Sequence, residues 1–367
     1  MTGPRAPRSG AAAPQVEVVI PVHRVERPIE RAVASVLDPA RGVHPIVVCH
    51  NMPAAALGER LTRFGEAVRV LELHDGVPSP AGPLNMGLDA ARAPWVTCMG
   101  SDDHEEPGAT GAWTEHLRAR PVDALILPVR RAATGRVDIP PVRPGRLRDL
   151  DPVRDRLCHR TGPLALVRTQ LLRSRGIRMT EGLRTGEDLA WSTHVWMAAR
   201  RIDLLEPGSP CYVEDQSGPR VTATPFPLVE LLEPARRLAG EAWVHDLTPA
   251  RRHALAVRVV RESLLRALRT RATDIDEGGA QRAHEVATAW RALDPGVARP
   301  LSLSETRALG VLLRTPDVVA VSRAAQALDS GNRLARILPP SPMGLCDPEA
   351  RLRHLASRLL RPGPWRG

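Results

Sequence analysis

Short apolar runs recur along the first 130 residues and alternate with stretches in which apolar residues keep a helical spacing. The run at 16–22, Val-Glu-Val-Val-Ile-Pro-Val, is rich in β-branched residues, which is typical of a buried strand in a parallel sheet. Similar runs predict strands at 45–49, 68–73, 95–99 and 124–129. Helical spacing follows at 27–37, around Leu57, Leu61 and Phe64, and at 83–91. This alternation predicts a doubly wound α/β sheet.

The pattern changes twice further along the chain. Residues 130–160 are rich in proline and arginine and predict a long surface excursion. A strand at 164–167, helices at 169–175 and 187–200, and short strands at 202–205 and 211–213 complete the α/β part. From 227 onward, long amphipathic stretches of Ala, Leu and Arg predict an all-helical domain. The expected organisation is a disordered tail over 1–15, an α/β domain over 16–226 and a helical domain over 227–367.

The composition excludes a collagen-like, a disordered and a disulfide-scaffold protein. The chain has 367 residues, of which 43% are hydrophobic and 25% charged, which is globular composition. No apolar stretch reaches the roughly 20 residues of a membrane-spanning helix. The five cysteines form no C-x-x-C pair, which favours a reducing cytoplasm.

All 51 basic residues are arginine, and the formal net charge is +10. Without lysine, a Walker-type phosphate lysine and a Schiff-base lysine are excluded. The charge could attract nucleic acid, but phenylalanine and tyrosine are too scarce for base stacking. We therefore interpret most of the arginines as a solvated surface and expect no nucleic-acid partner.

Polar clusters follow three of the predicted strands, at 21–24, 49–51 and 100–106. Ligands in open α/β sheets bind beyond the carboxyl ends of the strands. The third cluster, Gly-Ser-Asp-Asp-His-Glu-Glu, holds adjacent carboxylates, whose oxygens suit Mg²⁺ or Mn²⁺. A second acidic pair, Glu187 and Asp188, opens a predicted helix. Acidic residues are also favoured in a helix's first turn, so a purely structural role stays open for both groups.

Other catalytic signatures are absent from the sequence. It contains no H-E-x-x-H, G-x-S-x-G or G-x-G-x-x-G motif, so nothing indicates a zinc protease, an α/β-hydrolase or a dinucleotide-binding enzyme.

Taken in order, the motifs resemble those of the family 2 glycosyltransferases. They are V-V-I-P-V-H-R, a helix ending A-V-A-S-V-L, the segment 79–88, Gly-Ser-Asp-Asp at 100–103 and Gly-Glu-Asp at 186–188. The resemblance covers about residues 16–225. It implies a GT-A fold, a nucleotide-diphospho-sugar donor, a divalent metal and transfer with inversion of the anomeric centre.

The resemblance also implies roles for individual residues. Asp188 matches the general base, with Glu187 as its neighbour, and Asp102 matches the metal-binding aspartate of the D-x-D motif. The segments that would contact the nucleotide sugar contain Pro21, His23, Glu26, His50, Asn51, Asn85, Ser101, Asp102, Asp103, Arg220 and Thr222. Mn²⁺ or Mg²⁺ is the expected cofactor.

Two positions depart from the family pattern. Gly100 stands where the first aspartate of D-x-D is expected, and His50-Asn51 stands where an acidic residue usually contacts uracil. These departures keep a second hypothesis open, a catalytically degenerate GT-A-like module for binding or assembly. For an active enzyme, the expected acceptors are a glycan, a lipid-linked molecule or a small molecule.

The helical domain has more than one interpretation. Its apolar stripes are packing surfaces in the simplest reading. Dimerisation and peripheral contact with the inner face of the membrane through basic amphipathic faces remain open. The expected location is the cytoplasm, with that membrane face as the alternative.

Overall fold

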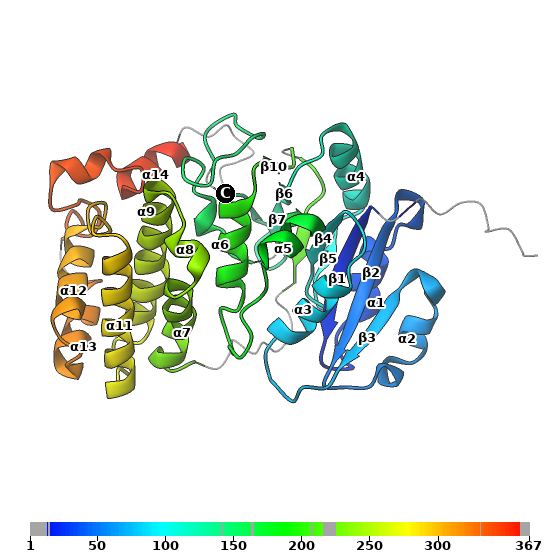
Figure 1. Cartoon of the computed structure of the whole chain (residues 1–367), viewed down its shortest axis with the longest axis horizontal. Helices are drawn as coiled ribbons and strands as arrows, with labels where there is room; N and C mark the ends of the chain where they lie inside the picture. The colour runs from blue at the N-terminus through cyan, green and yellow to red at the C-terminus, as the bar shows by residue number, and fades with distance from the viewer. Residues whose placement is uncertain are drawn as a thin grey trace, which may run out of the picture.

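The structure is a computed structural model, and it describes residues 13, 15–140, 142–162, 165–206, 208–215, 225–330 and 332–359. All but two residues of the predicted disordered tail, 1–15, lie outside this set. Figure 1 shows a part built around a sheet beside a part made of helices. The observed class is the predicted one, an α/β domain followed by helices.

The main sheet has seven strands in the order β10-β6-β9-β4-β1-β2-β3. Their bounds are β1 Val16–Val22, β2 Val43–His50, β3 Arg69–Leu73, β4 Trp95–Cys98, β6 Ala124–Ile126, β9 Ala165–Arg168 and β10 Ile202–Leu204. All neighbours pair in parallel except β9, which runs antiparallel to β4 and β6. In β1, the three consecutive residues Val18, Val19 and Ile20 are at most 1% exposed, as expected for a strand covered on both faces.

A smaller sheet has the order β5-β11-β7-β8. Its strands are β5 His104–Glu105, β7 Val129–Arg131, β8 Val137–Asp138 and β11 Tyr212–Glu214. The single strand predicted at 124–129 is wrong, because β6 and β7 belong to different sheets. Pro128 separates them; it has no N–H to donate to a ladder, and its carbonyl accepts from the Tyr212 N–H at 3.0 Å.

Helices cover both faces of the main sheet. The α-helices of this domain are α1 Ile29–Val36, α2 Glu59–Thr62, α3 Ala81–Ala90, α4 Ala109–Ala119, α5 Thr169–Arg175 and α6 Asp188–Ala198. Short 3₁₀ turns lie at Pro39–Arg41, Ala54–Leu57, Gly65–Ala67 and Leu157–His159. Residues of α1, α2 and α4 share one apolar core, and residues of α3, α5 and α6 share the core on the opposite face. The sheet is therefore doubly wound, as predicted, although α4 was not predicted.

The stretch at 130–160 is less open than the predicted excursion. It contributes β7 and β8 and then folds back through an ion pair between Arg143 Nη2 and Asp155 Oδ2 at 2.7 Å. Asp155 is fully buried and also accepts the N–H of Asp151. Because a buried carboxylate with several donors resists displacement, this part of the stretch is fixed to the domain.

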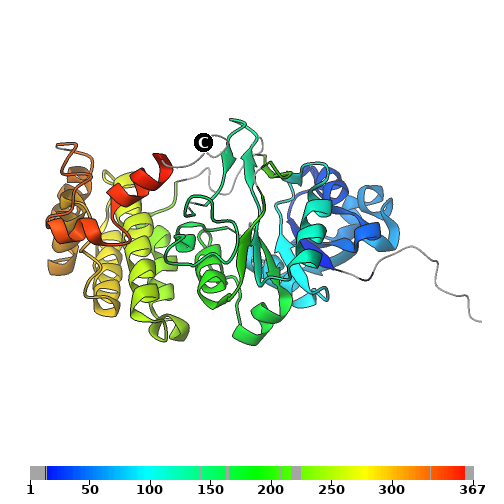
Figure 2. The ribbon, with the colours of Figure 1, turned by 90° about the horizontal axis from the view of Figure 1, so that it is seen from above.

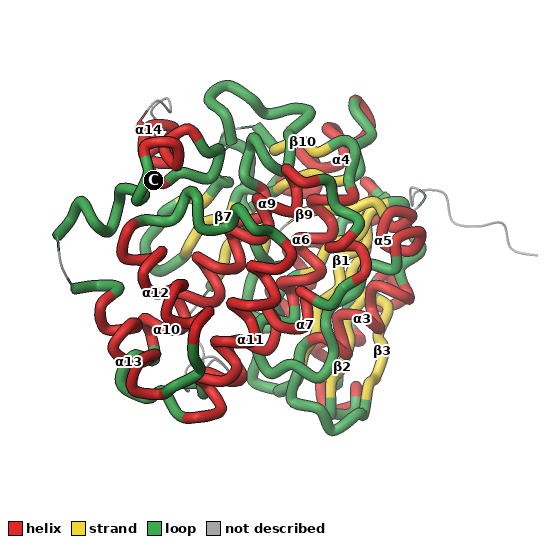
Figure 3. Tube along the Cα trace, turned by 60° about the vertical axis from the view of Figure 1, so that its left-hand side comes forward, coloured by secondary structure: helices red, strands yellow, loops and turns green. Residues whose placement is uncertain are grey.

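The C-terminal part is helical, as predicted. Its helices are α7 Leu228–Ala239, α8 Ala242–His245, α9 Pro249–Arg258, α10 Arg266–Thr270, α11 Glu277–Leu293, α12 Leu303–Arg314, α13 Val318–Ala327 and α14 Arg351–Leu359. A π-helical segment, Val259–Leu265, joins α9 to α10, and a 3₁₀ turn spans Pro342–Cys346. Figure 2 shows α7, α11 and the following helices stacked away from β1–β3, and Figure 3 shows α11, α12 and α13 on the opposite side of α7 from these strands.

Helix α6 connects the two parts of the molecule. Leu189 and Met197 belong to the apolar core of the helical domain, whereas Trp191 and Val195 belong to the core beneath the main sheet. Both ends of α6 are thus fixed by packing. Among the described helices, none has the length and apolarity to cross a bilayer.

Candidate active site

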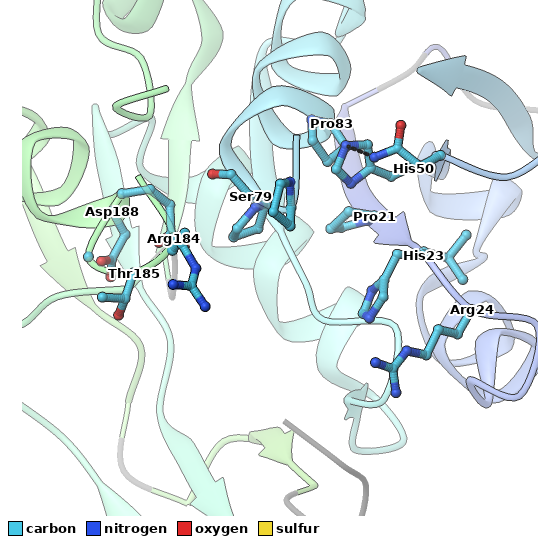
Figure 4. Close-up of a pocket in the computed structure, with 15 residues that line it drawn as sticks. Pro21, His23, Arg24, His50, Ser79, Pro83, Arg184, Thr185 and Asp188 are labelled. Atoms are coloured by element: carbon cyan, nitrogen blue, oxygen red, sulfur yellow. Dashed lines mark hydrogen bonds between the residues drawn. The ribbon is translucent and has the colours of Figure 1, made fainter. Parts of the chain in front are cut away.

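A cavity of about 560 Å³ lies between the carboxyl ends of β1 and β2 and the beginning of α6. Figure 4 shows Pro21, His23 and His50 on one side and Arg184, Thr185 and Asp188 on the other, with Ser79 between them. The lining comprises Pro21, Val22, His23, Arg24, His50, Asn51, Pro78, Ser79, Pro80, Pro83, Arg184, Thr185, Gly186, Glu187 and Asp188. Segments about 160 residues apart in sequence therefore share one cavity.

Parallel pairing of β1 with β2 builds the first wall. Val22 pairs with Cys49, so the residues that leave each strand emerge side by side. Asn51 turns the chain with φ 55°, a left-handed conformation that asparagine tolerates better than most residues. This turn places His50 and Asn51 beside Pro21 and His23, as the motifs predicted.

Asp75, which the sequence analysis did not single out, supplies a carboxylate to this wall. Its Oδ1 lies 2.9 Å from His50 Nε2 and 3.4 Å from Asn51 Nδ2. Burial alone would raise the pKa of Asp75, but hydrogen bonds from the Val77 N–H and from His50 hold it below its usual value. The segment His74-Asp75-Gly76 follows β3, the neighbour of β2. Its position at the end of a strand could have identified Asp75 as a site residue from the sequence.

The second wall is the beginning of α6. Gly186 has φ 72°, and this left-handed turn leads into Glu187 at the N-cap and Asp188 in the first turn. Burial, and then repulsion by Asp188, raises the pKa of Glu187 to about 7. Burial also raises the pKa of Asp188, and the charge of Arg258 opposes that rise. Two neighbouring carboxyls with raised pKa values in a cavity are suited to accepting a proton near neutral pH.

The cluster that follows β4 is organised differently. Asp102 forms an ion pair with Arg27, and Arg31 donates to the Asp102 carbonyl. Asp103 is buried, accepts from the Tyr212 hydroxyl and accepts from the Asp215 N–H at 2.9 Å. Burial raises the pKa of Asp103 to about 6. Neither aspartate lines the cavity described above.

Gly100 is required by this arrangement. A Cβ atom at residue 100 would lie 2.5 Å from Asp103 Oδ2 and 3.0 Å from Asp102 Oδ1. The side chains of Asp102 and Asp103 thus occupy the space that an aspartate at position 100 would need.

The expected Mg²⁺ or Mn²⁺ ion does not fit the residues that this structure shows. The Asp102 carboxylate is paired with Arg27, and Asp103 is engaged by Tyr212 and Asp215. Within the described ranges, no three His, Cys, Asp or Glu side chains are grouped to hold a metal ion. A cation at Asp102 would have to displace a guanidinium group.

The remaining predicted residues lie outside the cavity wall. Glu26 is exposed and Ser101 is buried, and neither lines the cavity. Asn85 is 2% exposed and bonds to Met179 and Glu181 instead. Arg220 and Thr222 lie outside the described residues. Arg184 and Thr185, which do line the cavity, carried no recognisable motif.

Comparison with known proteins agrees with this architecture. Residues 17–176 match the family described as Glycosyl transferase family 2. Among curated proteins, none matches the chain.

Solved structures of TarS from S. aureus share the fold. TarS 1-349 in complex with UDP-GlcNAc is 18% identical, with a TM-score of 0.72 over 85% of this chain and 91% of that one. The same fragment in complex with UDP is 17% identical, with a TM-score of 0.70. This match spans 85% of this chain and 90% of that one. A longer TarS structure is 17% identical, with a TM-score of 0.71. The match spans 87% of this chain and 56% of that one. Through residues 17–176 this chain is therefore similar to glycosyl transferase family 2, and this match supports a glycosyltransferase.

Proposed function

We propose that the chain transfers a sugar from a nucleoside-diphosphate donor to an acceptor hydroxyl, with inversion and with Asp188 as general base. One observation carries the proposal. Asp188 and the residues that leave β1 and β2 line the same cavity, so a base and a donor site face each other.

The wall of β1 and β2 is suited to the nucleotide. His50, Asn51 and Asp75 are linked by hydrogen bonds and offer both donors and acceptors to a base or ribose. Arg24 and Arg184 line the same cavity and can bind phosphate oxygens through their guanidinium groups. A UDP-type donor is supported by the complexes of TarS with UDP-GlcNAc and UDP, whose fold this chain shares.

Asp188 would act on the acceptor. A sugar or alcohol hydroxyl becomes a strong nucleophile only as a positioned base takes its proton. Burial raises the pKa of Asp188, and the higher proton affinity makes this carboxylate a better base. The activated oxygen attacks the anomeric carbon from the face opposite the departing nucleoside diphosphate, and this single displacement inverts the configuration.

Metal assistance by Mg²⁺ or Mn²⁺ at Asp102 remains a prediction from the family resemblance. Because Arg27 occupies the Asp102 carboxylate, none of the steps above passes through a metal ion. The acceptor classes, a homo-oligomer through the helical domain and a location at the inner face of the membrane also remain predictions.

Donor binding and product release test the function. UDP, GDP, dTDP and ADP, with the matching sugar nucleotides, are titrated calorimetrically with and without Mn²⁺, and release of nucleoside diphosphate is followed in parallel. Asp188→Asn should lower turnover at least 100-fold while donor affinity changes less than threefold. Asp246→Asn, which changes an exposed carboxylate just after α8, is the matched control.

The outcomes separate the two hypotheses. Failure of every nucleotide to bind would contradict the donor site, and full turnover in Asp188→Asn would contradict the base. Tight donor binding without any transfer or hydrolysis would instead favour the degenerate binding module.

A further inference from the structure

We propose that the guanidinium group of Arg27 takes the place of a divalent cation at Asp102, so that the donor diphosphate is bound and neutralised by arginine instead of a metal ion. This inference rests on the nucleotide-sugar function proposed above. It replaces the divalent metal ion that the family resemblance implied with an arginine side chain.

The first observation is the ion pair itself. Arg27 lies just before α1, and its Nη1 bonds to Asp102 Oδ2 across 75 positions of sequence. The Arg27 side chain is 13% exposed and that of Asp102 is 23% exposed. The pair is therefore largely withdrawn from water, where an ionic hydrogen bond is stronger than at an open surface.

A second arginine fixes the same aspartate. Arg31 lies in the first turn of α1, four residues after Arg27. It donates to the Asp102 carbonyl and, at 2.9 Å, to Asp215 Oδ2. Two positive groups therefore surround Asp102 in the place where the resemblance implied one divalent ion.

The site also lacks room for the carboxylate that a metal would need. At residue 100, even a Cβ atom would collide with Asp103 Oδ2 at 2.5 Å. Asp103 cannot turn outward without giving up the Tyr212 hydroxyl and the Asp215 N–H. One paired aspartate is a poor protein ligand set for Mg²⁺ or Mn²⁺.

The pair acts electrostatically on a side chain of the donor cavity. His23 lines that cavity, and its pKa is lowered first by burial and then by the charge of Arg27, while Asp102 opposes the effect. Arg27 and Asp102 are thus within electrostatic reach of a cavity-lining side chain. A diphosphate that extends past His23 would meet Arg27.

Arginine has the chemistry for this role. Its planar guanidinium group presents N–H donors in a fixed geometry that matches carboxylate and phosphate oxygens. Charge developing on the departing diphosphate would be stabilised by a positive group already oriented by Asp102, which requires little reorganisation during the reaction.

Calorimetric titration of the full chain with UDP tests the inference. We expect the Kd for UDP to change less than threefold between 5 mM EDTA and 5 mM MnCl₂. Arg27→Gln should weaken UDP at least tenfold, and uridine, which has no phosphate, less than twofold. Arg118→Gln, an exposed arginine on α4, is the matched control and should leave both affinities unchanged.

A metal titration supplies a measurement that needs no variant. Electron paramagnetic resonance of Mn²⁺ mixed with the wild-type chain and UDP should show only the ion bound by free UDP. Stoichiometric Mn²⁺ binding to the protein, or loss of UDP affinity in EDTA, would overturn the inference while leaving the donor function intact. If the wild type binds neither UDP nor another nucleoside diphosphate under any condition, the donor function itself fails and the inference with it.

Discussion

Glu187 and Asp188 show how two adjacent side chains acquire chemistry from their surroundings. Both carboxyls open α6, where a helix N-terminus favours negative charge. Burial nevertheless raises both pKa values, and for Glu187 the value reaches about 7. Because burial and then repulsion by Asp188 disfavour the charge on Glu187, the protonation of Glu187 changes near neutral pH.

The pH dependence of transfer should report this pair. A general base acts only when deprotonated, so kcat/KM should rise with pH through an apparent pKa above that of a free aspartate. Burial and repulsion by Asp188 raise the pKa of Glu187 to about 7, so Glu187→Gln should remove the part of the profile that changes near pH 7. Rates measured between pH 5 and 9 check this. Glu115→Gln, at an exposed position of α4, should leave the profile unchanged, and an unshifted profile in Glu187→Gln would contradict the coupling.

Two glycines should respond in opposite ways to an added methyl group. Gly100→Ala brings Cβ to 2.5 Å from Asp103 Oδ2, so the buried carboxylate must move; we expect a loss of about 1–3 kcal/mol in the free energy of unfolding. Gly310→Ala in α12 meets only the flexible end of Arg314 at 3.4 Å and should gain about 0.5–1 kcal/mol. Chemical denaturation of both variants measures the difference. Equal stabilities would show that the space at Gly100 is not constrained.

Helix α3 holds the segment that leads into α6. The Asn85 side chain on α3 accepts from the Met179 N–H at 2.9 Å and donates to the Met179 carbonyl at 3.1 Å and to Glu181 Oε1 at 2.8 Å. Its amide is therefore fully occupied by protein groups, and we assign it a positioning role instead of the predicted donor contact.

Asn85→Ala tests this role. The loss of these bonds leaves buried groups of Met179 unpaired, so we expect stability to fall by about 1–3 kcal/mol. Donor affinity should fall as well, because the released segment carries Arg184 and Thr185. Gln281→Ala removes an exposed side-chain amide bond on α11 and is the control for both measurements. Reduced stability with unchanged donor affinity would show that Asn85 has only a structural role.

Periodicity predicted most of the elements but missed interruptions that depend on packing. Within the predicted helical domain, α9 and α10 are joined by the π-helical segment Val259–Leu265 instead of forming one regular helix. A widened turn of this kind leaves the apolar pattern almost unchanged. Helix α4, Ala109–Ala119, was missed because Gly, Thr and Ala dominate its beginning and dilute the apolar stripe.

The end of the chain connects distant parts of the molecule through charged groups. His253 on α9 bonds to Asp294 at 2.6 Å and to Asp347 at 3.1 Å, and His159 bonds to the buried Glu349 at 3.0 Å. Residues 347–349 thus close over α9 and over the end of the 130–160 stretch. Nothing in the amphipathic pattern of the helical domain indicated this contact.

His253 should make stability depend on pH. Burial lowers its pKa, but the hydrogen bonds to Asp294 and Asp347 outweigh this and raise it from 6.5 to about 9. The stabilisation is therefore complete below pH 6.5 and disappears as pH rises through 9. His253→Gln should cost about 1–3 kcal/mol at pH 6 and much less at pH 10. His245→Gln, at a ring that bonds to the Ala239 backbone carbonyl at 3.1 Å, is the matched control, and a constant cost for His253→Gln between pH 6 and pH 10 would refute the assignment.

The alternation of apolar runs was enough to predict the doubly wound sheet, and the order of short motifs was enough to predict the similarity to glycosyl transferase family 2. Both depend on local preferences and on where strands end in parallel sheets. The identity of the group opposite Asp102 depends instead on contacts between distant segments. Because β4 lies beside β1, Arg27 reaches Asp102, and because Asp103 turns toward Tyr212, Gly100 has no room for a side chain. Such pairings form only when the folded chain brings these segments together. Neither the spacing of motifs nor the composition specifies which charged side chains will pair.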